Sequence, residues 1–338
     1  MTDTPVANSA GDGDDSAPAP RARRWIRCGG WIAAVAASAG VLLHLTIKDA
    51  VWPLSAAFYG LPCWICFTGA VVAAIAFRLS GSRRGGQVCA ALSLACLVWC
   101  VAKDLRPLTA APDRDATFRL AMWNPFQGTR GWPEIAEAID SFDADLVCLV
   151  EGGGRSPKQR AFWADALPHL PSHHLGYGYV VLSHYPVTLV SDPLDEPLDD
   201  RVEVDVNIDG TTVRVILFHT LSSPVFDRSD VAASLVRRAN ETTSEPTIIC
   251  GDFNLPADSA LLEPLRPAYA LASDGAGFFH RPTWPMPVPV LTLDQVWLGG
   301  GLQTAGCRHH WSNLSDHRAV IVDVAIGPPP DAGSDEAE

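Results

Sequence analysis

The stretch Thr247-Ile248-Ile249-Cys250-Gly251-Asp252-Phe253-Asn254 sets polar residues directly behind a run of residues that favour β-structure. Side chains alternate along an extended chain, so we expect Asp252 and Asn254 to face the same side. A carboxylate can accept a proton from water, and a neighbouring amide can orient that water. The same residues also fit an ordinary turn, so their meaning depends on the rest of the chain.

Apolar runs between residues 111 and 326 predict further strands and helices. The predicted strands lie at 118–123, 146–150, 179–183, 202–208, 213–219, 247–252, 293–298 and 319–324. Helical periods occur at 133–142, which has Pro in its first turn, and at 229–240. Asp209-Gly210 between two of the strands is a hairpin signal. Helices mixed with antiparallel strands predict an α/β sandwich, with two packed sheets and helices outside.

Polar residues stand at six ends of these predicted strands. They are Asn124, Glu151, His219, Asp252 with Asn254, Asp294, and Asp316 with His317. Each alone fits a turn, a cap or a hydrogen-bonded structural residue. Together they predict one site at one edge of the sheets, because active sites collect where strands end in loops.

In their order and spacing these motifs resemble the endonuclease/exonuclease/phosphatase superfamily, the DNase I-like metal-dependent phosphodiesterases. The resemblance covers residues 117–325. It rests on WN at 123–124, DLVCLVE at 145–151, FHT at 218–220, GDFN at 251–254, LDQVW at 293–297 and SDH at 315–317. It implies a four-layer α/β sandwich, two packed mixed β-sheets flanked by helices, that hydrolyses phosphate esters with Mg²⁺ or Mn²⁺.

Three of the strand-end residues suit a metal site. Glu151 is a hard oxygen ligand of the kind that Mg²⁺ takes, usually one or two carboxylates beside several waters. Asn124 and Asp316 are expected to complete that shell directly or through water. The cofactor expected from these ligands and the resemblance is Mg²⁺ or Mn²⁺.

The other five strand-end residues suit the chemistry of phosphoester hydrolysis. Asp252 is expected to orient and deprotonate the attacking water, with Asn254 holding the geometry. His317 is expected to donate to the phosphoryl oxygen, with Asp294 orienting its ring. His219 is expected to face the same phosphate, as a second electrostatic contact or as the acid for the leaving group.

Three uncharged stretches precede this domain, at 28–47, 55–77 and 85–102. A helix crosses a bilayer with about 20 largely apolar residues. We therefore predict a membrane anchor at 21–106 with three transmembrane helices; buried core helices are the alternative, and a cleaved signal peptide is a rival for the first stretch. The catalytic domain is expected at 111–326, and the acidic tails at 1–20 and 327–338 have the composition of disordered segments.

Positive charge in short loops predicts the orientation of the anchor. Seven arginines lie before the first stretch and between the second and third: Arg21, Arg23, Arg24, Arg27, Arg78, Arg83 and Arg84. These loops are expected inside, so an odd number of spans places the catalytic domain outside the cytoplasm, in a multi-pass protein of the cell membrane.

The cysteines do not predict a disulfide framework. Six of the nine lie in the apolar stretches, where Cys behaves as a small hydrophobe. The pair Cys63-x-x-Cys66 resembles a redox or metal pair, yet it lies in an apolar run without basic neighbours, and the hydrophobic interpretation is preferred.

The net charge of the predicted catalytic domain limits the substrates that it is expected to bind. Residues 111–326 hold 15 Lys and Arg against 28 Asp and Glu, a formal charge of −13. Extended duplex binding relies on many basic contacts to phosphates, so an acidic domain argues against general DNA degradation. A small or lipid phosphodiester therefore ranks ahead of nucleic acid, with the lipid bilayer as the other partner and no protein partner implied.

Other functions remain open from the sequence. One is a membrane-anchored endonuclease or exonuclease, another is a catalytically silent binding module of the same fold, and a third is a transport or sensory protein with an appended domain. The Pro- and aromatic-rich segment 278–290 fits either a substrate-facing loop or a surface loop that packs its own aromatics.

Overall fold

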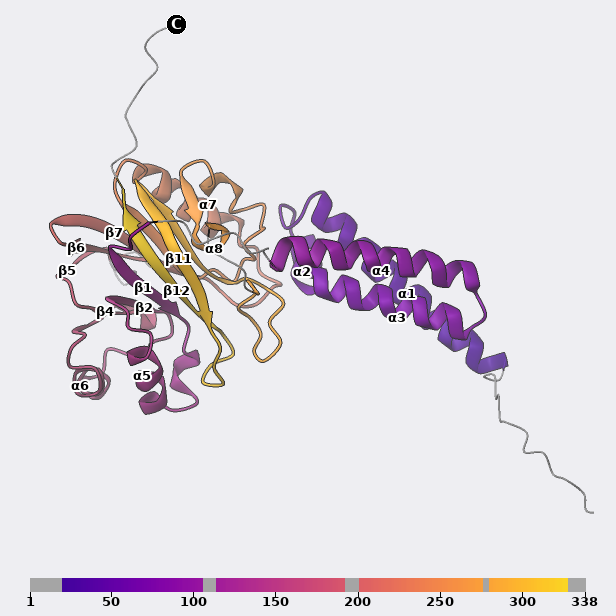
Figure 1. The fold of residues 1–338 in the computed structure, drawn as a ribbon, viewed down its shortest axis with the longest axis horizontal. Helices are drawn as coiled ribbons and strands as arrows, with labels where there is room; N and C mark the ends of the chain where they lie inside the picture. The colour runs from indigo at the N-terminus through magenta and orange to yellow at the C-terminus, as the bar shows by residue number, and fades with distance from the viewer. Residues whose placement is uncertain (1–19, 106–113, 192–200, 276–279, 328–338) are drawn as a thin grey trace, which may run out of the picture.

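The computed structural model describes residues 20–105, 114–191, 201–275 and 280–327. A stalk of N-terminal helices projects from one end of a larger domain built around β-strands (Figure 1). The tails predicted at 1–20 and 327–338 lie outside the described residues, apart from Pro20 and Gly327.

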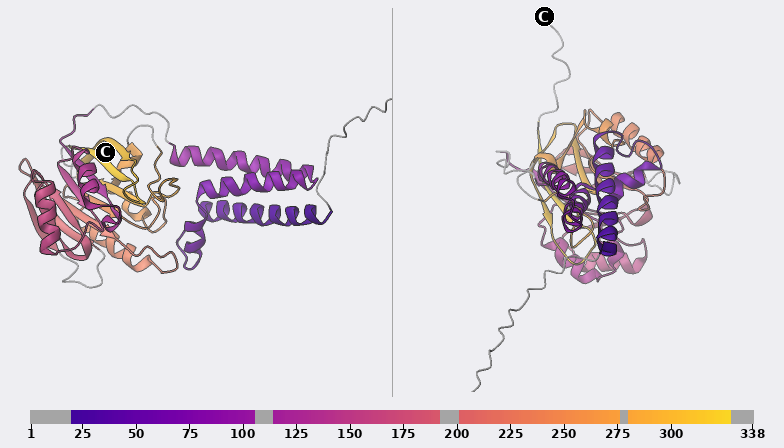
Figure 2. Two further views of the ribbon diagram at one scale, coloured as in Figure 1. Left: turned by 90° about the horizontal axis from the view of Figure 1, so that it is seen from below. Right: turned by 90° about the vertical axis from the view of Figure 1, so that its right-hand side faces the viewer.

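The stalk consists of α1 (Pro20–Leu45), α2 (Leu54–Gly60), α3 (Cys63–Leu79) and α4 (Arg83–Asp104). The long helices α1, α3 and α4 lie side by side (Figure 2). Within the described residues, two helices are long and apolar enough to cross a membrane, Arg21–Leu45 and Arg83–Asp104, or up to three if α2 and α3 together form one bent span.

The second predicted span, 55–77, is not one continuous helix, and this corrects the prediction of a single transmembrane helix there. α2 and α3 meet at a bend of 74°. Leu61 has the non-helical angles φ −122° and ψ 52°, and Pro62 begins the next helix as its N-cap. Proline lacks the backbone N–H and disfavours helical geometry at the preceding residue, so the helix breaks there although the composition stays apolar.

In its described residues, the large domain holds two six-stranded sheets. The first has the order β11 (Leu302–His310), β12 (Ala319–Ile326), β1 (Phe118–Trp123), β2 (Leu146–Leu149), β4 (Val180–Ser183) and β3 (Ser172–His174). The second has the order β5 (Val187–Ser191), β6 (Arg201–Ile208), β7 (Thr211–His219), β8 (Thr247–Asp252), β10 (Asp294–Gly299) and β9 (Tyr269–Leu271). Both are mixed: β1 pairs with β2 and β7 pairs with β8 in parallel, and the other pairs are antiparallel.

The two sheets pack face to face through their alternating apolar residues. On β6, Val202, Val204 and Val206 belong to this central core, whereas Glu203 between them belongs to the outer face. Helices α5 (Trp132–Asp140) and α6 (Pro157–Ala166) cover the outside of the first sheet, and α7 (Ser229–Glu241) covers the second. The short helix α8 spans Ala272–Gly275. Two packed mixed sheets flanked by helices were predicted, and the structure confirms them.

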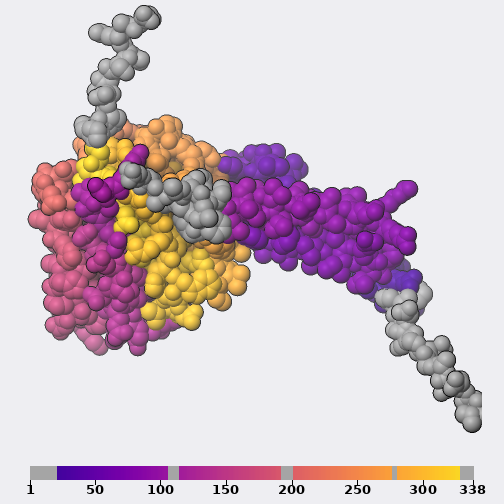
Figure 3. All heavy atoms as spheres, viewed as in Figure 1, coloured from indigo at the N-terminus to yellow at the C-terminus, as the bar shows by residue number. Residues whose placement is uncertain are grey.

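The outer face of the second sheet also buries residues of the stalk. Phe58 and Tyr59 of α2 belong to the same apolar cluster as Leu235 of α7 and Trp297 of β10. Figure 3 shows the stalk packed against this end of the domain. The helical region is therefore docked on the domain and is not only tethered to it by the chain.

A buried ion cluster fastens α7 to the second sheet. Glu203 is 2% exposed, and its carboxylate accepts two hydrogen bonds of 2.7 Å from Arg238 of α7. Arg201 and Arg214 lie within 3.4 Å of the same carboxylate. Burial alone would raise the pKa of Glu203, but the hydrogen bonds and charges of these arginines outweigh burial and hold it below its usual value.

We predict that Glu203→Gln lowers the free energy of unfolding by about 3 kcal/mol at neutral pH, because three arginines lose a buried partner. A carboxylate whose folded-state pKa is depressed stabilises the fold above its unfolded pKa of about 4.5 and loses that contribution as pH falls through its folded-state pKa. The difference between the natural chain and the variant should therefore shrink in acid. Thermal unfolding of the full chain at neutral and acidic pH measures this.

The control is Glu241→Gln. Glu241 also pairs with Arg238, at 3.0 Å, but its side chain is 65% exposed. Exposed pairs contribute about 0–1 kcal/mol, so this variant should unfold nearly as the natural chain does. Equal effects of the two substitutions would contradict the role assigned to the buried cluster.

Candidate active site

Apolar rows of the central core end in polar residues at the same end of the sandwich. On β7, Val215 and Leu217 face the core, and the next residue on that face is His219. By the same alternation, the core-facing row of β8 ends at Asp252, that of β10 at Asp294 and that of β1 at Asn124. The sequence-predicted residues therefore meet where the interior between the two sheets opens.

Strand register aligns three of these residues in one row. His219 of β7 pairs with Asp252 of β8, and Asp252 pairs with Asp294 of β10. Residues opposite each other on neighbouring strands have side chains close enough to interact. The parallel approach of β7 and β8 depends on Gly251, whose φ is +151° and where an added Cβ would lie 1.8 Å from the carbonyl oxygen of Phe218.

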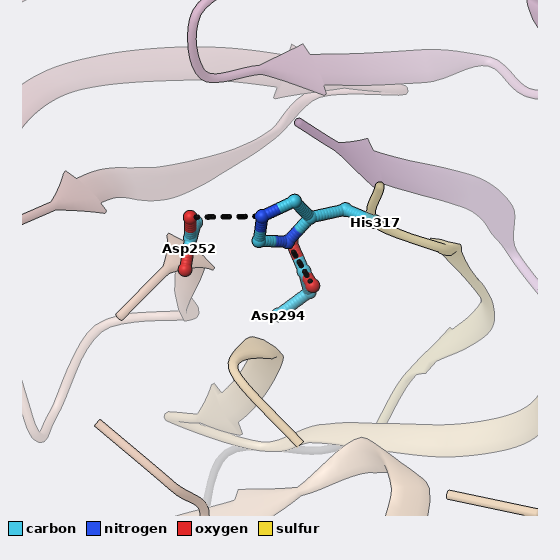
Figure 4. A group of neighbouring side chains, drawn as sticks. All are labelled: Asp252, Asp294 and His317. Carbon is cyan, nitrogen blue, oxygen red and sulfur yellow. Dashed lines mark hydrogen bonds and ion pairs between the residues drawn. The ribbon is translucent and has the colours of Figure 1, made fainter. Parts of the chain in front are cut away.

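His317 lies between two carboxylates (Figure 4). Its Nδ1 is 2.8 Å from Oδ2 of Asp294, and its Nε2 is 3.7 Å from Oδ2 of Asp252. The histidine is 5% exposed, and Asp294 is 1% exposed. Burial alone would lower the pKa of His317, but the carboxylates of Asp294 and Asp252 outweigh it and raise the pKa to about 10. The ring is therefore an imidazolium at neutral pH, with Nδ1–H donating to Asp294.

Backbone contacts hold this pair in position. The backbone N–H of His317 donates to Oγ of Ser315 at 3.0 Å, and the carbonyl of His317 accepts from the indole of Trp123 at 3.1 Å. Oγ1 of Thr283 accepts from the backbone N–H of Asp294 at 3.1 Å. The orientation of the imidazole is thus fixed from both sheets.

Two amides hold Asp252. Its Oδ1 accepts from the backbone N–H of Asn254 at 3.0 Å, and its Oδ2 accepts from Nδ2 of Asn124 at 3.1 Å. The side chain of Asn254 donates to the carbonyl of Thr220 at 2.9 Å. Asn254 adopts φ +49°, a left-handed conformation that asparagine tolerates better than most residues.

Glu151 lies near the same amide nitrogen of Asn124. Its Oε1 is 3.4 Å from Nδ2 of Asn124 and 3.5 Å from Nε2 of His219. Glu151 follows β2 with φ +53°. A left-handed conformation is uncommon for glutamate, and such strain gathers at functional sites. The backbone turn thus directs a carboxylate toward the other polar residues.

Asp316 is held by the segment that follows residue 280. Trp284 donates its indole N–H to Oδ2 of Asp316 at 3.2 Å, and the backbone N–H of Met286 donates to the carbonyl of Asp316 at 2.8 Å. Trp284 and Pro285 also line a cavity beside the site. Residues 280–290 therefore lie at the candidate site, where the first of the two alternatives for 278–290, a substrate-facing loop, would place them. Residues 278 and 279 lie outside the described residues.

The donor set fits a divalent cation. Glu151 and Asp316 are carboxylates that line the same cavity, and hard oxygen donors are the ligands of Mg²⁺ and related ions. Asn124 turns its amide nitrogen toward Glu151 and Asp252, while its Oδ1 accepts from the backbone N–H of Phe126 at 2.9 Å. To act as a ligand, Asn124 would have to present its oxygen on the side of those carboxylates.

Within the described residues, histidine and acidic donor atoms also form a tight cluster that includes neither Glu151 nor Asp316. The ligand atoms of Asp252, Asp294 and His317 lie within 4.8 Å of one another. Because Nδ1 of His317 is already bonded to Asp294, this cluster is accounted for as a hydrogen-bonded chain rather than as the predicted metal shell.

The cavity beside the site has a volume of about 580 Å³ and takes its walls from both parts of the chain. From the large domain come Phe126, Glu151, Ser222, Pro224, Arg228, Asn254, Trp284, Pro285, Val290, Leu291, Leu293 and Asp316; from the stalk come Ala56, Tyr59, Gly60, Pro62 and Ile65. The lining is largely apolar away from the acidic residues.

Among the cavity residues that sequence reasoning did not single out are Arg228, Tyr59 and Trp284, whose side chains reach the candidate site or the elements around it. Arg228 precedes α7, Tyr59 lies in α2, and Trp284 lies in a segment that was considered only as a whole. None of them ends a strand that faces the core, so the pattern that found the other residues could not find these.

The fold and site define a class of hydrolase, and comparison with known proteins agrees. Residues 125–317, more than half of the chain, match the model of the Endonuclease/Exonuclease/phosphatase family, and the chain belongs to this family. It is therefore an enzyme of the metal-dependent class that hydrolyses phosphate ester bonds.

Among curated proteins, the chain is similar to the uncharacterized protein YbhP of Escherichia coli K12. The two are 26% identical over 237 residues, which make up 57% of this chain and 88% of YbhP. Among solved structures, the chain is similar to an endonuclease/exonuclease/phosphatase from Beutenbergia cavernae at 20% identity and a TM-score of 0.46, covering 64% of this chain and 73% of that one. It is also similar to the 3′ phosphatase NExo from Neisseria, bound to a product DNA hairpin, at 16% identity and a TM-score of 0.48, covering 62% and 99%.

We predict that His317→Ala lowers kcat on a phosphodiester on the order of 100-fold, because a fixed cationic donor is lost. Asp294→Asn should be milder, since the amide still offers an acceptor to Nδ1–H. Groups that work as a unit are non-additive, so the double variant should be little worse than His317→Ala alone. Steady-state kinetics of the three variants measures this.

The control is His169→Ala. His169 also pairs with an aspartate, Asp140, at 3.2 Å, but both side chains are about half exposed or more and lie on the outer surface. Its activity should equal that of the natural chain. If the losses from Asp294→Asn and His317→Ala multiply in the double variant, the two residues act independently.

Proposed function

We propose that this chain is a membrane-anchored phosphodiesterase that uses Mg²⁺ or Mn²⁺ and acts on a small or lipid phosphodiester outside the cytoplasm. One observation carries the proposal. A continuous chain of contacts runs from Glu151 through Asn124 and Asp252 to His317 and Asp294, and it borders a cavity that the stalk helps to form.

The proposed metal site consists of Glu151, Asp316 and Asn124. A divalent cation bound there would polarise the phosphoryl group and offset the charge that develops on it. Asn124 holds Asp252 through its amide nitrogen. As a direct ligand it would turn its oxygen toward the cation and give up that hydrogen bond, whereas contact with the cation through water would leave it in place.

The proposed catalytic roles follow from position and charge. Asp252 orients the attacking water and accepts its proton, and Asn254 holds the carboxylate. His317 is an imidazolium whose Nε2–H faces the centre of the site, so it donates to a phosphoryl oxygen, and Asp294 keeps the ring in place. His219 lies 3.8 Å from Asp252 and faces the same region, which suits contact with the phosphate or protonation of the leaving group.

The charge of the domain supports a substrate with few phosphates. The domain carries a formal charge of −13, and the acidic site faces a largely apolar cavity. A long nucleic acid would need many basic contacts, whereas one phosphodiester can be held by a cation and two histidines. Membrane-anchored action on nucleic acid is the second candidate.

The arrangement of the stalk supports the proposed orientation. α1 and α4 run toward the large domain, and α3 runs away from it (Figure 2). The seven arginines at the start of α1 and around the α3–α4 turn therefore lie at the end of the stalk remote from the domain. If α1, α3 and α4 all cross, the positive-inside rule places the domain outside.

We predict that a C-terminal alkaline phosphatase fusion is active in cells, because that enzyme folds only outside the cytoplasm. A cytoplasmic reporter fused at the same position should be silent. The opposite pattern would contradict the proposed orientation without bearing on the catalytic site.

We also predict that hydrolysis of bis(p-nitrophenyl) phosphate by the full chain stops with EDTA and returns with Mg²⁺ or Mn²⁺. Glu151→Gln should raise the metal concentration required for half-maximal activity by roughly tenfold or more, because a charged ligand is lost while the shape is kept. The matched control is Glu137→Gln on the exposed side of α5, which should leave the metal requirement unchanged.

Two results would contradict this function. Full activity in chelator would exclude the metal site at Glu151. Tight binding of duplex DNA that falls steeply as salt rises would favour the nucleic-acid candidate over a small or lipid diester.

A further inference from the structure

The cavity beside the candidate active site has two walls of different origin. One wall holds the acidic residues Glu151 and Asp316, and the other is the elbow, which we define as residues 54–65: α2, Leu61, Pro62 and the first turn of α3. We infer that the elbow binds the hydrocarbon-bearing part of a membrane phosphodiester while its phosphate lies at the acidic wall. This inference rests on the proposed function and names its substrate class.

Buried contacts hold the elbow against the catalytic domain, so this wall of the cavity has a fixed position. Asp49, at 3% exposure, accepts from the hydroxyl of Tyr59 at 3.1 Å, from Oγ of Ser259 at 2.5 Å and from the backbone N–H of Ala260 at 2.7 Å. Phe58 is fully buried in the apolar cluster of the second sheet. The elbow is therefore held to the catalytic domain by polar and apolar contacts together.

Arg228 joins the two walls. Its guanidinium donates to the carbonyl of Asn254 and lies 4.9 Å from the ring centre of Tyr59. The residue is 4% exposed, and within the described part of the chain its buried Nε has no hydrogen-bond partner. Arg228 also lines the cavity, so its guanidinium presents a positive charge to an anionic phosphoester bound there. The cavity thus combines a cation with apolar walls, as an amphiphilic anion requires.

The rim of the cavity is suited to a bilayer surface. Trp52, just before α2, is 52% exposed and donates its indole N–H to the carbonyl of Val225 at 3.1 Å. Val225 and Phe226 are 62% and 54% exposed, and Pro224 beside them lines the cavity. Tryptophan favours the membrane–water interface.

The direction of α2 agrees with this placement. α2 lies at 74° to α3, as a helix in the plane of the interface would if α3 spans the bilayer. The exposed apolar residues of the rim therefore connect the apolar helices of the stalk with the candidate site. This connection favours a lipid over a soluble amphiphile as the occupant of the cavity.

A homologous series of alkyl p-nitrophenyl phosphates tests the inference, since the reacting group stays constant while the alkyl chain grows. The full chain in lipid nanodiscs is assayed with the methyl and hexyl diesters. If the elbow holds the alkyl chain, kcat/KM for the hexyl diester should exceed that for the methyl diester by roughly tenfold or more, because each buried CH₂ contributes to binding. A ratio near one in the natural chain would overturn the inference.

Two neighbouring alanines supply matched variants. Ala56 lines the cavity, and Ala57 on the same helix is exposed and does not line it. Ala56→Trp should bring the hexyl-to-methyl ratio close to one, whereas Ala57→Trp should keep the natural ratio. Gly60→Trp is a second filling variant, because an added Cβ at Gly60 meets no atom within 4 Å. Thermal unfolding shows which variants fold.

The outcomes separate the inference from the function on which it rests. No metal-dependent hydrolysis of the methyl diester by the natural chain would contradict the proposed function. Hydrolysis with a high ratio that persists in both Ala56→Trp and Gly60→Trp would leave the function standing and overturn the role of the elbow. Vesicles containing phosphatidylglycerol, added as competitor, should inhibit the hexyl reaction of the natural chain; no inhibition would count against a lipid occupant.

Discussion

The close parallel pairing of β7 with β8 is the constraint on which the site depends. Gly251 lets the two backbones approach where any side chain would collide with Phe218, and this approach sets His219 beside Asp252. β10 then adds Asp294 in register, and the first sheet contributes Asn124 and His317 from across the sandwich. Because His219, Asp252, Asp294 and Asn124 each continue an apolar row of the core, the forces that pack the core also bring these polar groups together.

Much of the fold could be predicted because central strands are buried and therefore apolar. All eight predicted strands are present, and the four other strands of the described residues, β3, β5, β9 and β11, form the edges of the two sheets. Edge strands have fewer buried positions, and β5 is largely exposed, so their sequences lack the apolar signal. The break after α2 was missed for the opposite reason. The segment is apolar throughout, and only Leu61-Pro62 marks the bend.

The same reasoning explains which site residues were found. The eight residues predicted from strand ends lie at one end of the sandwich, since a strand's end fixes where its last side chain points; their chemical roles remain proposals. Arg228, Tyr59 and Trp284 come from loops and from the stalk, and their positions depend on docking between segments far apart in sequence. Such docking leaves no periodic pattern in the amino-acid sequence. Charge alone did not reveal Arg228 either, because one buried cation is lost in the average of an acidic domain.

The docking of α2 has a consequence for how the protein matures. Phe58 and Tyr59 complete an apolar cluster of the catalytic domain, and the elbow completes a wall of its cavity. The helices are made first during synthesis, but this wall forms only when the finished domain folds back onto them. A catalytic domain separated from the stalk would expose that cluster and open the cavity to water on one side. Docking of the stalk and completion of this cavity are thus the same event.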